Sequence, residues 1–415
     1  MKILIVNQPL NNRGDESAHK ALVRRIRKEY PSATIGVLWI NANEDSVRQF
    51  SLSDCNVDYI NIRGIKGVSG LTKYAMIRGY FWLLYLHPTT RKIMHIYKKY
   101  DWIICAPGGI CMGGFQNWNH MLMLQLARLT KKKLVYYSRS FGPFPTETTD
   151  NRCFKKLSLQ MLNYFSFLSI RDKKTEALAN ELKMSYVSTV DTAFLDSPKV
   201  KLTDEVKEGI GIAPYVVFVP NLLIWHYHFK NLIKKDDVLE FFKCIYEVIK
   251  KKYPKHTIVM LPQTFNHGTY EGDDIYFFNE LKKYIGDNTI VVMPDTLSSD
   301  EQQTIIADSE CMIGARYHSI VFAINNAVPF IALSYEHKIA GLLETLDKLD
   351  CMIDISSGLE SSIIVSRLVS EFDKMIEGIH ENSRAQKEAK SKANDCFMKL
   401  VQVMNDDKKN TKPLK

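Results

Sequence analysis

The segment Gly314-Ala315-Arg316-Tyr317-His318-Ser319 lies between two apolar runs of different lengths. The short run 311–313 before it is typical of a buried strand, and the longer run 320–327 after it predicts a helix. A helix start binds anions, because its first turn has free N–H groups and the positive end of the helix dipole. Arg316 adds planar donors for phosphate or carboxylate, and His318 adds a group that exchanges a proton near neutral pH. The segment therefore predicts an α/β fold with a site for a small anionic substrate.

Apolar runs of strand length alternate with segments of helical periodicity through the rest of the chain. The runs of strand length are residues 2–6, 34–39, 102–105, 134–137, 167–170, 216–219, 257–261, 290–293, 311–313 and 330–333. Strands that alternate with helices form parallel sheets with helices on both faces. We therefore predict an α/β fold of two doubly wound, Rossmann-like domains facing a cleft, with ligands beyond the carboxyl ends of the strands.

The domain boundary is predicted from the charged stretch 197–211, which contains few large apolar residues. The predicted N-terminal domain covers residues 1–200, with a helical insertion near residues 70–100. The predicted C-terminal domain covers residues 205–370.

The end of the chain reads differently. Residues 371–404 predict one long helix, because apolar side chains recur every four residues in a narrow stripe. The stripe consists of Ala385, Ala389, Ala393, Phe397 and Val401. The charged residues 405–415 predict a disordered tail.

The composition narrows the class of protein. Hydrophobic residues make up 46% and charged residues 24% of the 415 residues, which is typical of a globular protein in water. The net charge of +9 fits an anionic substrate, an acidic membrane surface or simply the solubility of the protein. Because no nucleic-acid-binding module or basic reading helix is recognisable, we expect no nucleic-acid partner.

The eight cysteines and the N-terminus indicate the compartment. No two cysteines form a CxxC pair, and several lie in apolar runs, as thiols do in a reducing compartment. The apolar residues 2–6 are too few for a signal peptide, and no apolar stretch approaches the ~20 residues that cross a bilayer. We therefore expect a cytoplasmic protein. We also expect no metal, because His226 and His228 lack a third ligand at a suitable spacing.

Residues 74–100 depart from the α/β pattern. They are rich in aromatic and basic side chains, namely Tyr80, Phe81, Trp82, Tyr85, Arg78, Arg91, Lys92, Lys98 and Lys99. The sequence favours a helical insertion that packs on the core. The alternative is a helix pair that contacts an anionic membrane surface.

Two further loops with glycine follow predicted strands. In Asn11-Asn12-Arg13-Gly14-Asp15-Glu16, Gly14 permits a tight turn or the close approach of a ligand. The alternative is that Asp15 or Ser17 simply caps the following helix. The loop Pro107-Gly108-Gly109 could let the backbone approach a sugar or a phosphate.

Two charged residues after predicted strands, Arg171 and Asp191, could have either a functional or a structural role. Arg171 could clamp an anion, or it could pair with Asp172. Asp191 could be an active-site carboxylate, but we interpret it as the cap of the next helical segment.

Seven short segments, some of them described above, follow one another along the chain. They are Asn11 to Glu16, Gly108-Gly109, Ser140 to Pro143, Ser169 to Asp172, Asp191 to Leu195, Gly314 to Ser319 and Val328 to Tyr335. This order resembles the polysaccharide pyruvyl transferase family over residues 3–345. Two positions depart from the family pattern. Arg139 stands where the family often has Gln, and Pro107 stands where a third Gly is common. These departures bear on the identity of the acceptor sugar more than on the reaction itself.

The resemblance implies a fold like the two-domain glycosyltransferase B type. It also implies transfer of the pyruvyl group of phosphoenolpyruvate onto two hydroxyls of a sugar, giving a cyclic ketal, in capsular or extracellular polysaccharide biosynthesis. Mapped by motif, Arg171, Arg316 and His318 would bind phosphoenolpyruvate, with the C-terminal domain on the donor side. Phosphoenolpyruvate would be the donor substrate, and no cofactor is expected.

This transfer needs a general acid and a general base, and we hypothesise which residues provide them. His318 would be the acid or the partner of the phosphate, and Asp15 or Glu16 would be the base. The residues expected to bind the acceptor are Asn11, Gly14, Gly108, Gly109, Arg139 and Ser140. The family suggests a saccharide acceptor on a lipid carrier, and contact of residues 74–100 with the inner face of the membrane is compatible with it.

Two other functions fit the same sequence. A sugar-nucleotide-dependent glycosyltransferase of the same architecture would bind a nucleotide near Arg316 and His318, because a fold does not determine a function. A catalytically silent scaffold of a polysaccharide assembly complex would tolerate replacement of either residue.

Overall fold

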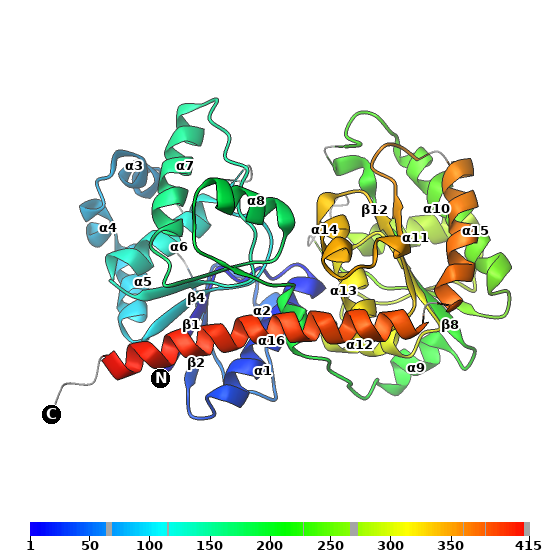
Figure 1. Cartoon of the computed structure of the whole chain (residues 1–415), viewed down its shortest axis with the longest axis horizontal. Helices are drawn as coiled ribbons and strands as arrows, with labels where there is room; N and C mark the ends of the chain where they lie inside the picture. Colours follow the sequence, from blue (N-terminus) through cyan, green and yellow to red (C-terminus); the bar gives the residue numbers. More distant parts are fainter. Residues whose placement is uncertain are drawn as a thin grey trace. The chain divides into compact units, whose positions relative to one another are not determined.

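The computed structural model describes residues 1–63, 69–113, 116–226, 228–265, 273–359, 361–377 and 379–410. The chain divides into two compact units (Figure 1). The first unit comprises Met1–Leu10, Ala18–Leu195 and Lys392–Lys415, and the second comprises Asn11–Ser17 and Asp196–Ser391. Each unit is built on a parallel sheet, which confirms the predicted α/β class.

The first unit contains a seven-stranded sheet in the order β3-β2-β1-β4-β5-β6-β7. Its strands are β1 (Lys2–Val6), β2 (Thr34–Ile40), β3 (Asp58–Ile62), β4 (Trp102–Cys105), β5 (Lys133–Tyr136), β6 (Phe167–Ile170) and β7 (Val187–Ser188). Its helices are α1 (Arg13–Glu29, whose first turn belongs to the second unit), α2 (Glu44–Phe50), α3 (Gly70–Arg78), α4 (Trp82–Leu86), α5 (Pro88–Lys98), α6 (Trp118–Leu129), α7 (Thr149–Leu162) and α8 (Lys173–Glu181), followed by the 3-10 turn η1 (Thr192–Leu195).

Side chains of successive residues enter opposite apolar layers, because neighbours along a strand point to opposite faces. Ile3 and Ile5 belong to the layer that contains α1 and the last part of the C-terminal helix, including Phe397 and Val401. Leu4 and Val6 belong to the layer formed with α3 to α7. Figure 1 shows these two sets of helices on the two sides of the sheet. The sequence does not reveal β3 and β7, because they are edge strands with partly exposed residues.

The second unit contains a six-stranded sheet in the order β10-β9-β8-β11-β12-β13. Its strands are β8 (Tyr215–Val219), β9 (Thr257–Met260), β10 (Val291–Val292), β11 (Met312–Gly314), β12 (Phe330–Ser334) and β13 (Met352–Asp354). Its helical elements are α9 (Asp204–Ile210), η2 (Leu223–Trp225), α10 (Lys235–Lys252), α11 (Asp274–Ile285), α12 (Ser299–Ala307), α13 (Tyr317–Asn325), α14 (His337–Thr345), η4 (Leu349–Cys351) and α15 (Ser361–Glu377). The predicted unit of strand, turn and helix around residues 314–319 is therefore β11 followed by α13.

The C-terminal region differs from the prediction of one helix over 371–404 and a disordered tail from 405. Helix α15 covers the beginning of this stretch and ends at Glu377, and α16 (Ile379–Asn410) then continues well beyond residue 404. Residues 411–415 lie outside the described residues. The five stripe residues of α16 are all buried, and Phe397 and Val401 pack on the sheet of the first unit. Within the described ranges, no helix has both the length and the apolar character required to span a membrane.

Candidate functional site

The predicted site residues divide between the two units. Asn11, Gly14, Asp15, Glu16, Arg316 and His318 belong to the second unit, and Gly108, Gly109, Arg139, Ser140 and Arg171 belong to the first. The grouping of residues 11–16 with the second unit corrects their predicted place in an N-terminal domain over 1–200. Its cause is backbone pairing with the loop after β9, which a local pattern does not reveal.

That pairing joins Asn12 and Thr264 in an antiparallel bridge. The amide of Arg13 donates to the carbonyl of Gln263 at 2.9 Å, and the amide of Phe265 donates to the carbonyl of Asn11 at 3.0 Å. The side chain of Asn12 accepts from the amides of Gly14 and Asp15 at 2.7 and 3.3 Å. Asn12 therefore caps α1, in place of the Asp15 or Ser17 that the sequence suggests.

Gly14 lies against the ring of His318. A Cβ atom at position 14 would lie 1.8 Å from both Cγ and Nδ1 of His318, well inside van der Waals contact. Glycine is thus required at position 14 for the close approach of the α1 backbone to His318, and the first turn of α1 packs against the imidazole. His318 is in the first turn of α13, its side chain is buried, and its ring makes an edge contact with Tyr317 at a centroid distance of 5.0 Å.

Glu16 has a structural role in this arrangement. It is fully buried, and its Oε2 atom accepts from Nη1 of Arg13 at 2.5 Å. Its Oε1 atom accepts from the amide and the hydroxyl of Ser299 at 3.1 and 3.3 Å, at the N-terminus of α12. A carboxylate held by a cation and a helix N-terminus is stabilised in its charged form but is poorly placed to reach a substrate. Asp15 is only partly buried, so it is the better candidate for a base.

Arg316 is held by Asp274, a partner that is not apparent in the sequence. Nη2 of Arg316, which is partly exposed, forms an ion pair with Oδ1 of the buried Asp274. The other oxygen of Asp274 accepts from the amides of Gln263 and Thr264, each at 2.9 Å. Asp273 caps α11 through the amide of Ile275. The side chains of both aspartates are therefore engaged in contacts within the second unit.

The pair with Asp274 leaves part of the Arg316 guanidinium available for a further contact. Burial alone would lower the pKa of the guanidinium, but Asp274, with Tyr335 and Glu336 nearby, raises its pKa above the ordinary value. The Nε atom of Arg316 is buried and has no hydrogen-bond partner among the residues that the structure describes. A planar guanidinium with one side held by a carboxylate and Nε still available can bind a second anion.

Tyr335 and Asn221, to which the sequence analysis assigns no role, extend this site. Both are buried, and Nδ2 of Asn221 donates to the phenolic oxygen of Tyr335 at 2.7 Å. Burial and the neighbouring Glu336 raise the pKa of Tyr335, so its phenol remains protonated at neutral pH and can donate a hydrogen bond. Oδ1 of Asn221 has no partner within the described part of the chain. No local pattern identifies this pair, because Asn221 follows β8 and Tyr335 follows β12.

In the first unit, the side chain of Arg139 bonds to residues on both sides of the loop Pro107-Gly108-Gly109 and is not exposed to solvent. It is fully buried, Nη1 donates to the carbonyl of Ala106 at 2.6 Å, and Nη2 donates to Sγ of Cys111 at 2.9 Å. Gly108 bridges to Arg139 with a φ of 152°, which side chains rarely adopt, whereas the space around Gly109 is open. The predicted contact of Arg139 with an acceptor sugar therefore has no support in its position.

Ser140 and Arg171 also use their side chains within the first unit. Ser140 is buried and donates its hydroxyl to Asp172 at 2.5 Å, and Asp172 caps α8 by accepting from the amide of Thr175. Arg171 pairs with Asp191, and not with Asp172 as the sequence suggests. Asp191 accepts from the amide of Ala193 at 3.0 Å, so it caps η1.

The imidazole rings of His226 and His228 stack at a centroid distance of 5.1 Å. Burial lowers the pKa of His226, although the nearby Glu336 opposes this effect. His226 is therefore neutral at pH 7. Across the described ranges, no three side chains of His, Cys, Asp or Glu are grouped as ligands of a metal ion.

Several solved structures share the architecture of this chain. A UDP-GlcNAc 2-epimerase from Neisseria meningitidis, bound to UDP-GlcNAc, is 12% identical, with a TM-score of 0.59 over 98% of this chain and 100% of that one. A UGT transferase from Siraitia grosvenorii in complex with UDP is 9% identical, with a TM-score of 0.57 over 97% of this chain and 99% of that one. At these identities the likeness shows the fold alone, which is that of glycosyltransferase B enzymes.

The sequence itself identifies the family. The chain is 24% identical over 394 residues to the amylovoran biosynthesis protein AmsJ of Erwinia amylovora, covering 88% of this chain and 90% of that protein. The family model described as polysaccharide pyruvyl transferase matches residues 12–337, which include Gly14, Arg171, Arg316 and His318. The chain therefore belongs to the polysaccharide pyruvyl transferase family and is a transferase.

Proposed function

We propose that the protein transfers the pyruvyl group of phosphoenolpyruvate onto two hydroxyls of a saccharide, forming a cyclic ketal during exopolysaccharide synthesis. The observation that carries the proposal is Arg316 at the start of α13, fixed by Asp274, with a buried Nε available and His318 two residues further on. Arg171 is proposed as a second cation for the donor. The relative AmsJ, a protein of amylovoran biosynthesis, supports a polysaccharide as the product.

The reaction requires a general acid and a general base, and the site residues can provide both. Protonation of the methylene carbon of phosphoenolpyruvate makes C2 electrophilic, and the first hydroxyl attacks C2 and loses its proton. The C2–O bond to phosphate then breaks, the second hydroxyl attacks C2, and its proton leaves with the phosphate. The products are the ketal and inorganic phosphate. We assign His318 as the acid, with binding of the phosphate as its alternative role, and Asp15 as the base on the acceptor side.

Binding of the donor can be tested by thermal-shift titration of the pure protein with phosphoenolpyruvate, UDP-sugars and GDP-sugars. A ligand that binds only the native state raises the melting temperature. We expect stabilisation by phosphoenolpyruvate and none by the nucleotide sugars. Stabilisation by a nucleotide sugar alone would instead indicate a glycosyltransferase, and no stabilisation by either would favour a scaffold.

The two acidic residues at the start of α1 are expected to respond differently to neutralisation. Glu16→Gln should lower the free energy of unfolding by about 3 kcal/mol, or Tm by about 6–12 °C, because Arg13 loses its buried partner. Asp15→Asn should leave Tm unchanged and reduce turnover by about 10²-fold, as loss of a general base does. Phosphate release and thermal denaturation measure both. Full turnover in Asp15→Asn would exclude Asp15 as the base.

Tyr335→Phe is expected to raise KM for phosphoenolpyruvate about tenfold, because the buried phenol no longer donates to the anion. The matched control is Tyr215→Phe, which removes a hydroxyl bonded to the carbonyl of Ile305 in the same unit. Steady-state kinetics of both variants decide the question. An equal change in the two variants would show that Tyr335 has no role at the donor site.

The saccharide acceptor is proposed to be lipid-linked, which would bring the protein to the inner face of the membrane. The proposed contact is the helical insertion within residues 74–100.

A further inference from the structure

Helices α3, α4 and α5 have two contrasting sides. Their inner side chains, such as Met76, Leu84, Ile93 and Tyr97, are buried in the core of the first unit. This confirms the helical insertion that packs on the core. Their outer surface, which we call the α3–α5 face, consists of exposed Leu71, Tyr74, Arg78, Tyr80, Trp82, Tyr85, Leu86, Arg91, Lys92, His95, Lys98 and Lys99.

The α3–α5 face exposes large apolar and aromatic side chains in unusual density. Trp82 is 61% exposed and Leu86 is 64% exposed, and Tyr74, Tyr80 and Tyr85 are also exposed. Tyrosine and tryptophan side chains are favoured where an apolar phase meets water, because their rings are amphipathic. A concentration of such groups on the surface marks a site of interaction.

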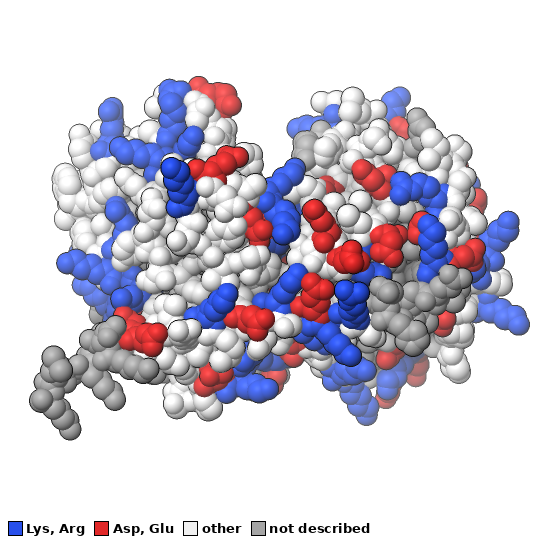
Figure 2. All heavy atoms as spheres, in the orientation of Figure 1, with Lys and Arg blue, Asp and Glu red and all other residues white. Residues whose placement is uncertain are grey.

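The charge of this region has one sign. Residues 59–100 contain eight Lys or Arg and no Asp or Glu. Figure 2 shows basic side chains at the left edge of the view, over the region of α4 and α5. Within the described residues, Arg91, Lys92 and Lys98 form no ion pair, whereas Lys73 pairs with Asp150 outside the insertion. The bases of α5 are therefore available to an anionic partner.

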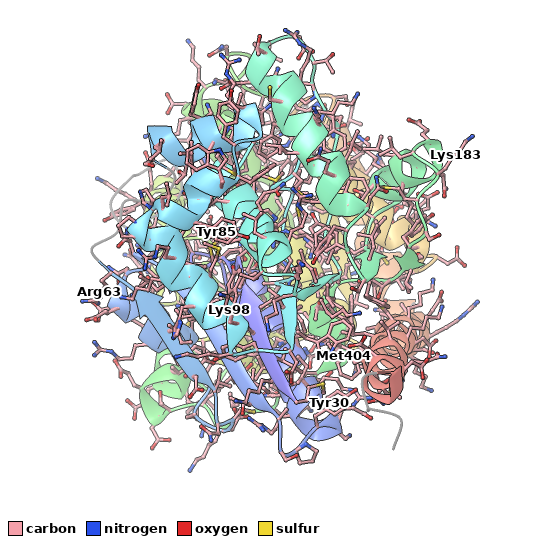
Figure 3. The ribbon with its side chains drawn as sticks, turned by 90° about the vertical axis from the view of Figure 1, so that its left-hand side faces the viewer. Tyr30, Arg63, Tyr85, Lys98, Lys183 and Met404 are labelled. Atoms are coloured by element: carbon pink, nitrogen blue, oxygen red, sulfur yellow. The ribbon has the colours of Figure 1, made fainter. Side chains whose placement is uncertain are left out.

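A groove of about 550 Å³ lies on this face. Its polar lining comes from Tyr85 of α4 and from Arg91, Lys92, His95 and Lys98 of α5. Figure 3 shows Tyr85 and Lys98 on the side of the first unit that is turned toward the viewer. Because no acidic side chain is among the described residues that line the groove, its chemistry matches a phosphate group, which binds well to clustered Arg and Lys.

We propose that the α3–α5 face binds an anionic phospholipid bilayer. Trp82, Leu86 and the tyrosines enter the interface between headgroups and acyl chains, and the groove binds headgroup phosphates. This inference deepens the proposed function, because membrane binding would place the enzyme beside a lipid-linked acceptor. In this respect the inference rests on the proposed function. The binding itself requires neither phosphoenolpyruvate nor turnover.

The test is flotation of the full-length protein with vesicles of phosphatidylcholine alone or with added phosphatidylglycerol. We expect the protein to float only with the anionic vesicles, and less as NaCl is raised. The variant Arg91→Gln/Lys92→Gln/Lys98→Gln should bind about 100-fold more weakly. The control Lys156→Gln/Lys174→Gln/Lys183→Gln removes the same charge from exposed positions elsewhere in the first unit and should bind normally.

A further variant, Trp82→Ser/Leu86→Ser, tests the apolar part and should also bind more weakly with an unchanged Tm, since both side chains are exposed. Three results would overturn the proposal. They are an equal loss of vesicle binding in the two triple variants, normal vesicle binding by Arg91→Gln/Lys92→Gln/Lys98→Gln, and no binding of the native protein to anionic vesicles. Release by inorganic phosphate, at an ionic strength where chloride has no effect, would instead indicate a site for a soluble phosphate. The thermal shift with phosphoenolpyruvate should be the same in all three variants, which separates this test from that of the reaction.

Discussion

Arg316→Ala is expected to abolish the thermal stabilisation by phosphoenolpyruvate and to lower kcat/KM by about 10³-fold, or about 4 kcal/mol. The guanidinium is the cation at the start of α13, and an alanine there leaves the donor anion without its charged partner. Thermal-shift titration and phosphate release under first-order conditions measure the two effects. Retention of the thermal shift would show that the donor binds elsewhere.

The alanine variant also leaves Asp274 buried without its cation, which by itself costs about 3–5 kcal/mol of stability. A matched variant avoids this ambiguity. Arg316→Gln/Asp274→Asn replaces the ion pair by two amides that can still hydrogen-bond, so its Tm should be closer to that of the native protein. We expect this double variant to fold and yet to gain no stability from phosphoenolpyruvate.

Gly14→Ala is expected to lower kcat/KM by about 10²-fold, because catalytic geometry that is displaced by about 1 Å costs roughly that factor. The added Cβ would lie 1.8 Å from the ring of His318, so either the imidazole or the first turn of α1 must move. The backbone of α1 is helical at this position, and a helical Gly→Ala change otherwise stabilises by about 0.5–1 kcal/mol. A loss of activity would therefore come from the contact with His318.

Gly341→Ala is the control for this effect. Gly341 is a helical glycine of α14 in the same unit, and apart from the backbone of its own helix and its chain neighbours no described atom lies within 4 Å of the Cβ that alanine would add. It should keep full activity with an equal or higher Tm. Normal kinetics in Gly14→Ala would show that the approach of α1 to His318 is not needed for turnover.

The core strands could be predicted from the sequence because their signal is local. The runs at residues 2–6 and 102–105 are continuous apolar stretches, since both faces of a parallel sheet are covered by helices. The edge strands β3, β7 and β13 lack this signal, because an edge strand is paired on one side only and leaves side chains partly exposed. The helix over 371–404 was predicted with wrong ends, because the stripe indicates helical periodicity but not where the helix starts or stops.

Residues of the candidate site can be recognised in the sequence where the motif that contains them lies within one strand and the turn after it. Arg316 and His318 follow β11 directly, so their place at a helix start could be predicted from six consecutive residues. Asp274 could not be recognised, because its ion pair joins residues 42 positions apart. For the same reason, no pattern in residues 11–16 shows that Glu16 is bound to Ser299, 283 positions away.

The sequence by itself determined the α/β class, the positions of the core strands along the chain and the family, because each of these depends on periodicity or on motifs within a few residues. The tertiary structure decided which of the polar residues are available for chemistry. It placed residues 11–17 with the second unit, committed Glu16, Arg139 and Ser140 to buried partners, and brought Tyr335 and Asn221 together near Arg316. The physical reason is that the cost of burying a polar group depends on partners that are distant in the chain, and only the fold brings those partners together.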